Sequence, residues 1–253
     1  MAPQFRHGKD TVVYFNGVNM GQVLNEVGHE QSAETADKTV FGDSDRRFLA
    51  GQRVASGSFS GLHDGSTEDT DETFRTALGS SAAVVVTVGN DGGDTIGNAA
   101  FLAAGVITSL AIQSPASDVV AVNAAVQYSS EARRGYWLAN LASRATATTH
   151  TAVDTLGTTG QSSTGGLTGH LHVTSATTSG TGAVELSANI QDSSDNATWA
   201  DFLSFTDLNS TAPENSYERV HTTGTANRYL RGRADVQGST AITYAIAVGL
   251  IGG

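Results

Sequence analysis

Short stretches of alternating polar and apolar residues recur along the chain and predict a protein built mainly of β-strands. The clearest stretch is residues 53–61, where Ala55, Gly57 and Phe59 alternate with three serines. Because successive side chains of a strand point to opposite faces, we expect a small-and-aromatic face and a serine face. The serine face would be open to water or to a neighbouring subunit. Residues 63–66 then have the composition of a turn.

Other runs of strand-forming residues extend this pattern. They lie at residues 11–15, 82–88, 101–110, 119–128 and 136–141. The dipeptide Asn16-Gly17 is favoured in tight hairpins. Residues 18–27 fit either a return strand or a short helix, and residues 29–38 fit either an exposed strand pair or a long loop.

Residues 66–79 have the pattern of a short α-helix. Ser66 is placed to cap the first turn, and Gly79 follows the last. Between them, Phe74, Ala77 and Leu78 form one apolar stripe. Four acidic residues occupy the first turns, where the helix dipole favours negative charge: Glu68, Asp69, Asp71 and Glu72. We prefer this explanation of the acidic cluster to a metal site.

The composition fits a folded, acidic protein of one large or two smaller domains. The 253 residues include 14 basic and 25 acidic side chains, giving a net charge of −11. Tight binding of nucleic acid needs clustered Lys and Arg and is disfavoured. The acidity suits either plain solubility or a surface past which DNA slides. The chain has no cysteine, which excludes disulfides, Cys-ligated zinc and thiol catalysis.

The start of the chain lacks the apolar core of a signal peptide, and no apolar run approaches the roughly 20 residues of a membrane helix. We therefore expect synthesis in a cytoplasm and no membrane span.

Residues 145–166 are almost entirely small and polar, and residues 157–166 have the composition of a flexible linker. The sequence therefore predicts a first domain at 1–156 and a second at 167–253. Turn signals about every ten residues in the second domain predict a small β-sandwich, of immunoglobulin-like or jelly-roll type.

Three features of the second domain have alternative interpretations. Trp199 could stack on a sugar ring, beside the further glycan-contact candidates Asn196, Tyr217 and Tyr229, or pack against Phe202 and Phe205. His170 and His172 share a strand face and could bind a metal, but no third ligand is suggested, and surface histidines are favoured. Alternation places Arg231 and Arg233 on one face and Arg228 on the other. We favour pairing of these arginines with carboxylates over phosphate binding.

Candidate chemistry elsewhere is weak. The loop at residues 89–95 has two carboxylates but lacks the ligand spacing of an EF-hand, so an ordinary turn is favoured. No nucleophile elbow, phosphate loop, dinucleotide fingerprint or His-Glu-x-x-His motif occurs. We expect no enzymatic activity, no cofactor and no metal.

Several runs in the first 140 residues together resemble the major tail tube proteins of long-tailed, non-contractile (siphovirus-type) phages. The runs are Leu24-Asn-Glu-Val27, Thr39-Val-Phe-Gly-Asp43, Phe48-Leu-Ala-Gly51 and Gly57-Ser-Phe-Ser-Gly-Leu-His-Asp-Gly65. The resemblance implies a tail-tube-type β-sandwich or barrel with one helix. It also implies a structural virion protein forming hexameric rings, stacked into a hollow tube that conducts double-stranded DNA. Residues 191–201 are similar to hairpins of jelly-roll domains appended to virion proteins, so the second domain would decorate the tube exterior.

The resemblance also implies partners. These are further copies of the chain, the tape measure and tail terminator proteins, DNA passing without specific binding, and host surface glycans. In the family, a long loop in this part of the chain contacts the next ring. Residues 29–50 are therefore expected to form contacts between rings or subunits, with candidates Glu34, Asp37, Lys38, Asp43, Asp45, Arg46, Arg47 and Phe48. The alternatives are a carbohydrate-binding module or adhesin, and a head–tail adaptor or capsid decoration protein.

Overall fold

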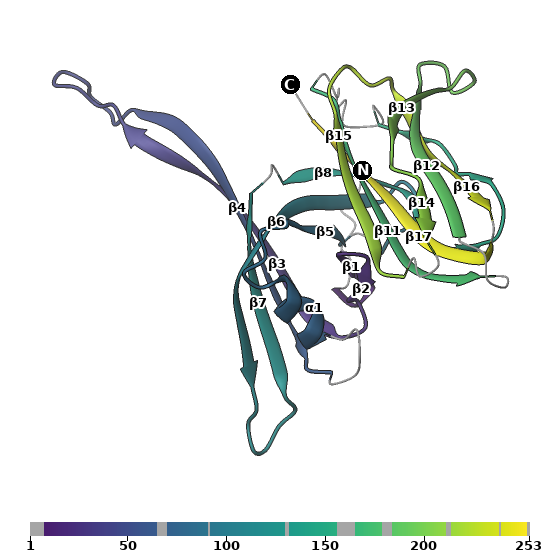
Figure 1. Cartoon of the computed structure of the whole chain (residues 1–253). Coiled ribbons are helices and arrows are strands. Elements are labelled where there is room, and N and C mark those ends of the chain that lie inside the picture. Colours follow the sequence, from purple (N-terminus) through teal and green to yellow (C-terminus); the bar gives the residue numbers. More distant parts are fainter. Residues whose placement is uncertain are drawn as a thin grey trace. The chain divides into compact units, whose positions relative to one another are not determined.

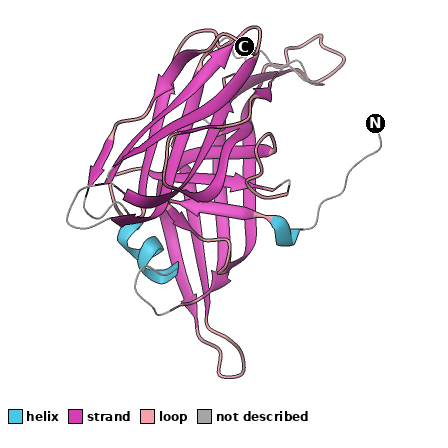
Figure 2. Cartoon of the chain, turned by 90° about the vertical axis from the view of Figure 1, so that its right-hand side faces the viewer, coloured by secondary structure: helices cyan, strands magenta, loops and turns pink. Residues whose placement is uncertain are grey.

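The computed structural model describes residues 8–64, 70–90, 92–129, 132–155, 165–178, 184–210, 214–237 and 239–251. As predicted, the chain is mainly β, with one α-helix in the described part (Figure 2). No helix there is long and apolar enough to cross a membrane.

The first half of the chain contributes these elements (Figure 1): η1 (Gly8–Asp10), β1 (Val12–Phe15), β2 (Val18–Asn19), β3 (Leu24–Asp37), β4 (Phe48–Leu62), α1 (Thr70–Ala77), β5 (Val84–Gly89), β6 (Ala99–Gln113) and β7 (Ala121–Tyr128). The second half contributes β8 (Arg133–Arg144), β9 (Thr148–Thr149), β10 (Val153–Asp154), β11 (Leu167–Thr178), β12 (Val184–Ser193), β13 (Ala200–Ser204), β14 (Leu208–Ser210), β15 (Ser216–Thr222), β16 (Tyr229–Gln237) and β17 (Ser239–Leu250).

The chain divides into two compact units. Unit 1 comprises Met1–Gln22, Val85–Ala103 and Arg133–Gly253, and unit 2 comprises Val23–Val84 and Ala104–Ala132. These units follow strand pairing rather than the predicted boundary at residues 157–166. Strand β8, before that boundary, pairs with β17, after it, from Ile242↔Arg144 to Gly249↔Gly135. Most of the predicted linker, residues 157–164, lies outside the described residues.

Unit 1 contains two sheets with a large core between them. One sheet has the order β15-β11-β17-β8-β6-β5-β1-β2, in which β6 pairs with β8 through Ala99–Leu102. The other sheet has the order β10-β16-β12-β13. Alternation along β12 and β16 sends every second side chain inward, so Leu186, Ile190 and Leu230 are buried against Leu171 and Ile246. A small sandwich of this kind is what the pattern after residue 167 predicts.

The other face of β8 and β17 is also covered. Trp137, Ala245 and Ala247 point away from the main core and form a second cluster with Tyr14 and Leu102. The ring of Tyr14 meets Trp137 edge-on at 5.5 Å between centroids. Strands β8 and β17 of unit 1 are therefore buried on both faces.

Unit 2 is a four-stranded antiparallel sheet with the order β3-β4-β7-β6. Helix α1 packs on one face, where Phe74 lies 6.3 Å from Phe59 between ring centroids. Gly57 is needed on this face because a Cβ atom there would lie 2.2 Å from the hydroxyl of Tyr128. The expected alternation of residues 53–61 is confirmed, since Gly57, Phe59 and Gly61 are buried and Ser58 is exposed.

The structure also decides between the open alternatives of the first 80 residues. Residues 18–19 and 24–37 are strands, joined to β1 by a turn in which Asn16 has a φ of 49°. The predicted helix is confirmed over Thr70–Ala77. Its proposed cap, Ser66, lies outside the described residues.

Candidate assembly interface

The β3–β4 hairpin is the most exposed part of unit 2 (Figure 1). The two strands pair from Leu24↔Gly61 near the sheet to Asp37↔Phe48 near the tip. Between Glu30 and Val54 every residue is exposed except Asp43, which is half-buried. An isolated two-stranded hairpin is marginally stable in water, so an extended one is expected to gain stability from contact with another surface.

The polar groups at the hairpin tip bond to one another. The Asp37 carboxylate accepts hydrogen bonds from the backbone N–H and the hydroxyl of Thr39, at 2.9 and 2.5 Å. The Thr39 hydroxyl in turn accepts the Arg47 backbone N–H at 3.0 Å, and Asp43 accepts the Val40 N–H at 3.1 Å. These bonds lower the pKa of Asp37, so its carboxylate is charged at neutral pH. They give the tip a defined shape without any partner.

Several apolar side chains of the same hairpin are exposed to solvent. Phe41 is fully exposed. Four other apolar side chains are also exposed: Val40 at 65%, Leu49 at 58%, Phe48 at 53% and Val54 at 40%. Single exposed apolar residues are common, but five along one hairpin are typical of an interaction surface. We refer to these five residues as the apolar tip.

All eight residues predicted as subunit contacts lie on this half of the hairpin: Glu34, Asp37, Lys38, Asp43, Asp45, Arg46, Arg47 and Phe48. Asp43 and Arg47 form an ion pair across the tip, with 3.6 Å between Oδ1 and Nε. The prediction selected seven charged residues and Phe48, and it did not include the exposed apolar residues Val40, Phe41, Leu49 and Val54. In the sequence these residues appear as apolar side chains beside a polar loop. Such a pattern does not distinguish exposed apolar residues from core residues.

One outer strand of the unit 2 sheet, β3, has a free edge, because it pairs only with β4 among the described strands. Strand β6 pairs with β7 over Gly105–Gln113. The same strand also has β5 and β8 as hydrogen-bonded neighbours, and Ile107 forms a bridge with Leu78. Unpaired N–H and C=O groups along such edges are templates for another strand.

The sheet face opposite α1 is open, polar and free of basic side chains over its paired region. Register places Glu26 and Glu30 of β3 beside Ser60 and Ser56 of β4, which lie beside residues of β7 such as Asn123. The Ser60 hydroxyl donates to Asn123 Oδ1 at 2.6 Å. This face is lined mostly by Ser, Ala, Asn and Gln, with two carboxylates near its β3 edge.

On the α1 side, the side chain of His29 lies in the interior of unit 2 next to Tyr128. Its Nδ1 lies 3.1 Å from the Tyr128 hydroxyl, and burial lowers its pKa to about 4. His29 is therefore neutral at physiological pH and serves packing.

The four glycan-contact candidates do not form one site. Trp199 is half-buried beside the guanidinium of Arg231, whose Cζ lies 4.0 Å from the ring centroid. Tyr229 lies two residues before Arg231 on β16, and Asn196 lies in the turn that follows β12. Tyr217 lies on β15, in the other sheet of unit 1.

The interpretation of His170 and His172 as surface histidines is wrong. Both are fully buried, because β1 and β5 of unit 1 cover this face of β11. The Thr87 hydroxyl lies 2.8 Å from His170 Nδ1 and 2.8 Å from His172 Nε2, and the Gly17 N–H donates to His172 Nδ1 at 3.3 Å. Burial lowers both pKa values, that of His172 to about 3. Among the described residues no cluster of His, Asp or Glu could hold a metal ion.

The arginine predictions are confirmed in part. Arg228 forms two hydrogen bonds to the Asp154 carboxylate, at 2.8 and 2.6 Å. Arg231 and Arg233 share a strand face as expected, but neither forms an ion pair with a described carboxylate. In the loop at residues 89–95, Asp94 accepts hydrogen bonds from Tyr14 and the Leu141 N–H, so its role there is structural.

No protein family model matches this chain, and no curated protein matches it. Solved structures with a similar arrangement are mainly components of tails and baseplates. The tail of an empty gene transfer agent particle with C6 symmetry is 23% identical, with a TM-score of 0.41 over 51% of this chain and 97% of that chain. The anti-feeding prophage baseplate is 11% identical, with a TM-score of 0.39 over 53% and 96%. The SPP1 Dit protein is 14% identical, with a TM-score of 0.35 over 95% and 99%.

Proposed function

We propose that this chain is a structural subunit of a phage-type tail, and that its copies form hexameric rings stacked into a hollow tube that conducts double-stranded DNA. The observation that carries the proposal is the sheet of unit 2, which has a free edge at β3, an exposed β3–β4 hairpin and one open polar face. The sequence resemblance of the first 140 residues supports the same conclusion independently. The proposal assigns no catalytic activity to the chain.

Strand direction makes edge-to-edge closure simple. In the order β3-β4-β7-β6 every neighbouring pair is antiparallel, so β3 and β6 run in opposite directions. The end of β6 beyond the bridge at Ile107 would then join the β3 edge of the next copy in the same antiparallel pattern. Six copies with four strands each would close a barrel that has no free edge. At about 4.8 Å per untilted strand, such a barrel is about 37 Å across its backbones, wide enough for a DNA duplex.

The open polar face would line this tube. Its serines, asparagine and glutamine are short or neutral, and its ionised groups, Glu26 and Glu30, repel phosphate. A surface without Lys or Arg lacks the counterion release that holds DNA on proteins. DNA would pass without sticking, as the acidic composition suggested.

The apolar tip would join one ring to the next. The tip is ordered by its own hydrogen bonds, so burying Phe41 and its neighbours on another copy would cost little further ordering. Contact with tape measure and tail terminator proteins, and display of residues 167–253 on the tube exterior, stay predictions of the resemblance.

Negative-stain electron microscopy of the purified protein across a concentration series tests the proposal. Six-fold rings or stacked tubes are expected at high concentration. Closed rings that never stack would favour a head–tail adaptor or capsid decoration protein. Monomers at every concentration would contradict self-assembly and favour a binding module.

A further inference from the structure

One face of unit 1 gathers aromatic and basic side chains in an otherwise acidic protein. On β16, Tyr229, Arg231 and Arg233 alternate with the buried residues Leu230, Gly232 and Ala234 and so share the outer face of the sheet. Strand β12 lies beside them, with Gln191 opposite Arg231 and Asn189 opposite Arg233. We refer to this surface as the β12–β16 face.

Arg231 is held rigidly on this face. Its guanidinium lies over the Trp199 ring at 4.0 Å, and its Nε donates to Gln191 Oε1 at 2.9 Å. Gln191 Nε2 donates in turn to Asp201 Oδ1 at 2.7 Å. This chain of contacts fixes the planar guanidinium and leaves its terminal nitrogens without a carboxylate partner among the described residues.

Arg233 is exposed, and it forms neither a hydrogen bond nor an ion pair with the described residues. Partial burial lowers the pKa of Arg231, and the charge of Arg233 lowers it further. Two like charges are thus placed side by side, which disfavours the free protein unless an anion binds. Arg228 differs, because Asp154 already neutralises it with two hydrogen bonds.

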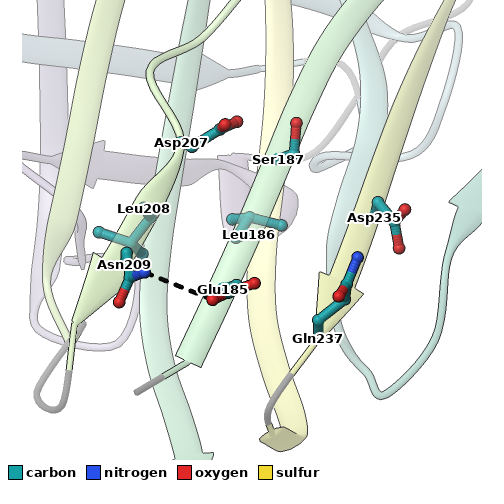
Figure 3. A pocket seen from close by; sticks show the side chains of 8 residues that line it. All are labelled: Glu185, Leu186, Ser187, Asp207, Leu208, Asn209, Asp235 and Gln237. Carbon is teal, nitrogen blue, oxygen red and sulfur yellow. Dashed lines mark hydrogen bonds between the residues drawn. The ribbon is translucent and has the colours of Figure 1, made fainter.

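The same face continues into a polar hollow of about 320 Å³ (Figure 3). The side chains of Glu185, Ser187, Asp235 and Gln237 line it, and Asn209 donates to Glu185 across it at 3.4 Å. Between the hollow and Arg231, the buried Oδ1 of Asn189 has no hydrogen-bond partner. From Glu185 to Ser193 the face extends for about 26 Å along β12.

We propose that the β12–β16 face binds an acidic saccharide, with Arg231 and Arg233 holding its carboxylate or phosphate groups. Trp199 and Tyr229 supply aromatic surface for sugar rings, and the amide, hydroxyl and carboxylate groups of the hollow match sugar hydroxyls, which both donate and accept. Nucleic acid is disfavoured because Asp201, Asp235 and Glu185 would oppose a chain of phosphates. The proposal does not depend on tube assembly.

Tryptophan fluorescence of the full chain provides the test, because the chain has two tryptophans and Trp137 is fully buried. The probes are two saccharides with a single anionic group, 3′-sialyllactose and maltose 1-phosphate, together with neutral maltohexaose and a single-stranded oligonucleotide. We expect a saturable change with at least one acidic saccharide and binding at least tenfold weaker with maltohexaose. Isothermal titration calorimetry of the same probes gives the affinities.

Two variants locate the site. Arg233→Gln removes an exposed side chain without described contacts, so folding should be unchanged, and affinity for the acidic saccharide should fall about 10- to 100-fold. Arg231→Gln should have at least the same effect. Arg75→Gln, which removes one charge from the exposed side of α1, is the matched control and should bind normally. The proposal is overturned if neither acidic saccharide binds, if only the oligonucleotide binds, or if Arg233→Gln binds like the control.

Discussion

The two units of the chain differ in how much of their sheet surface they cover. Unit 1 buries both faces of β8 and β17 and pairs several interior polar groups, as in the Tyr14–Asp94 and Thr87–His172 contacts. Unit 2 covers only the α1 side of its sheet and leaves an open face, a free edge at β3 and an exposed hairpin. A surface that costs stability in a monomer persists when it is used by a partner. The difference supports the proposal that copies of the chain assemble through unit 2.

The strongest test of this contrast removes the apolar tip. Phe41→Asp should abolish ring stacking, because it places a charge where an apolar side chain would be buried. The fold should be unaffected, with the free energy of unfolding within about 0.5 kcal/mol of the parent protein, since Phe41 is fully exposed. Electron microscopy and thermal unfolding measure the two effects. Phe41→Leu is the matched control and should still stack. A Phe41→Asp variant that forms normal tubes would refute a role for the tip.

Core substitutions test whether the units are stabilised separately. Ile190→Ala in the unit 1 core should cost about 2–5 kcal/mol, and Phe59→Ala beneath α1 about 3–5 kcal/mol. Hydrogen exchange should localise each effect, with faster exchange in β12 and β16 for the first variant and in β4 and β7 for the second. If either variant accelerated exchange equally across both units, the two units would unfold together and would not be stabilised separately.

Acid should weaken unit 1 more steeply than unit 2. Burial lowers the pKa of His150 to about 4, that of His172 to about 3 and that of His170 well below 6.5. In unit 2, burial lowers the pKa of His29 to about 4. The unfolded chain binds a proton at each histidine near pH 6.5, and the folded chain does not. Stability is therefore retained above about pH 7 and lost as the pH falls from 6.5 towards 4, by about 1.4 kcal/mol per pH unit for each histidine.

Urea unfolding followed between pH 7 and 4.5 gives this slope. His170→Asn should reduce the number of protons taken up when unit 1 unfolds by about one, because the position no longer titrates. His221→Asn is the matched control, because it makes the same substitution at an exposed histidine of unit 1. An unchanged slope in His170→Asn would show that the buried histidines do not set the acid sensitivity.

Much of this architecture was readable from the sequence. Alternation predicted the β-rich class, the strand at residues 53–61 and the sandwich after residue 167, and the acidic turn predicted α1. The missed features depend on which strands meet in space. A composition break at 157–166 could not reveal that β8 returns to pair with β17, nor that β1 and β5 cover His170 and His172. Likewise, the sequence offered Trp199 but not its contact with Arg231, because these residues lie 32 positions apart.

The smallest structural change with a functional effect is Glu30→Lys on the open face of unit 2. Glu30 is exposed, so the free energy of unfolding should stay within about 0.5 kcal/mol of the parent value. In a six-fold ring the change would place six lysines around the passage and allow phosphate contacts that release counterions. Assembled tubes should then retain duplex DNA at low salt and release it as salt rises, in a filter-retention assay. Glu214→Lys adds the same charge at an exposed position of unit 1 and should not retain DNA. Equal retention by both variants would mean that the open face of unit 2 does not line the passage.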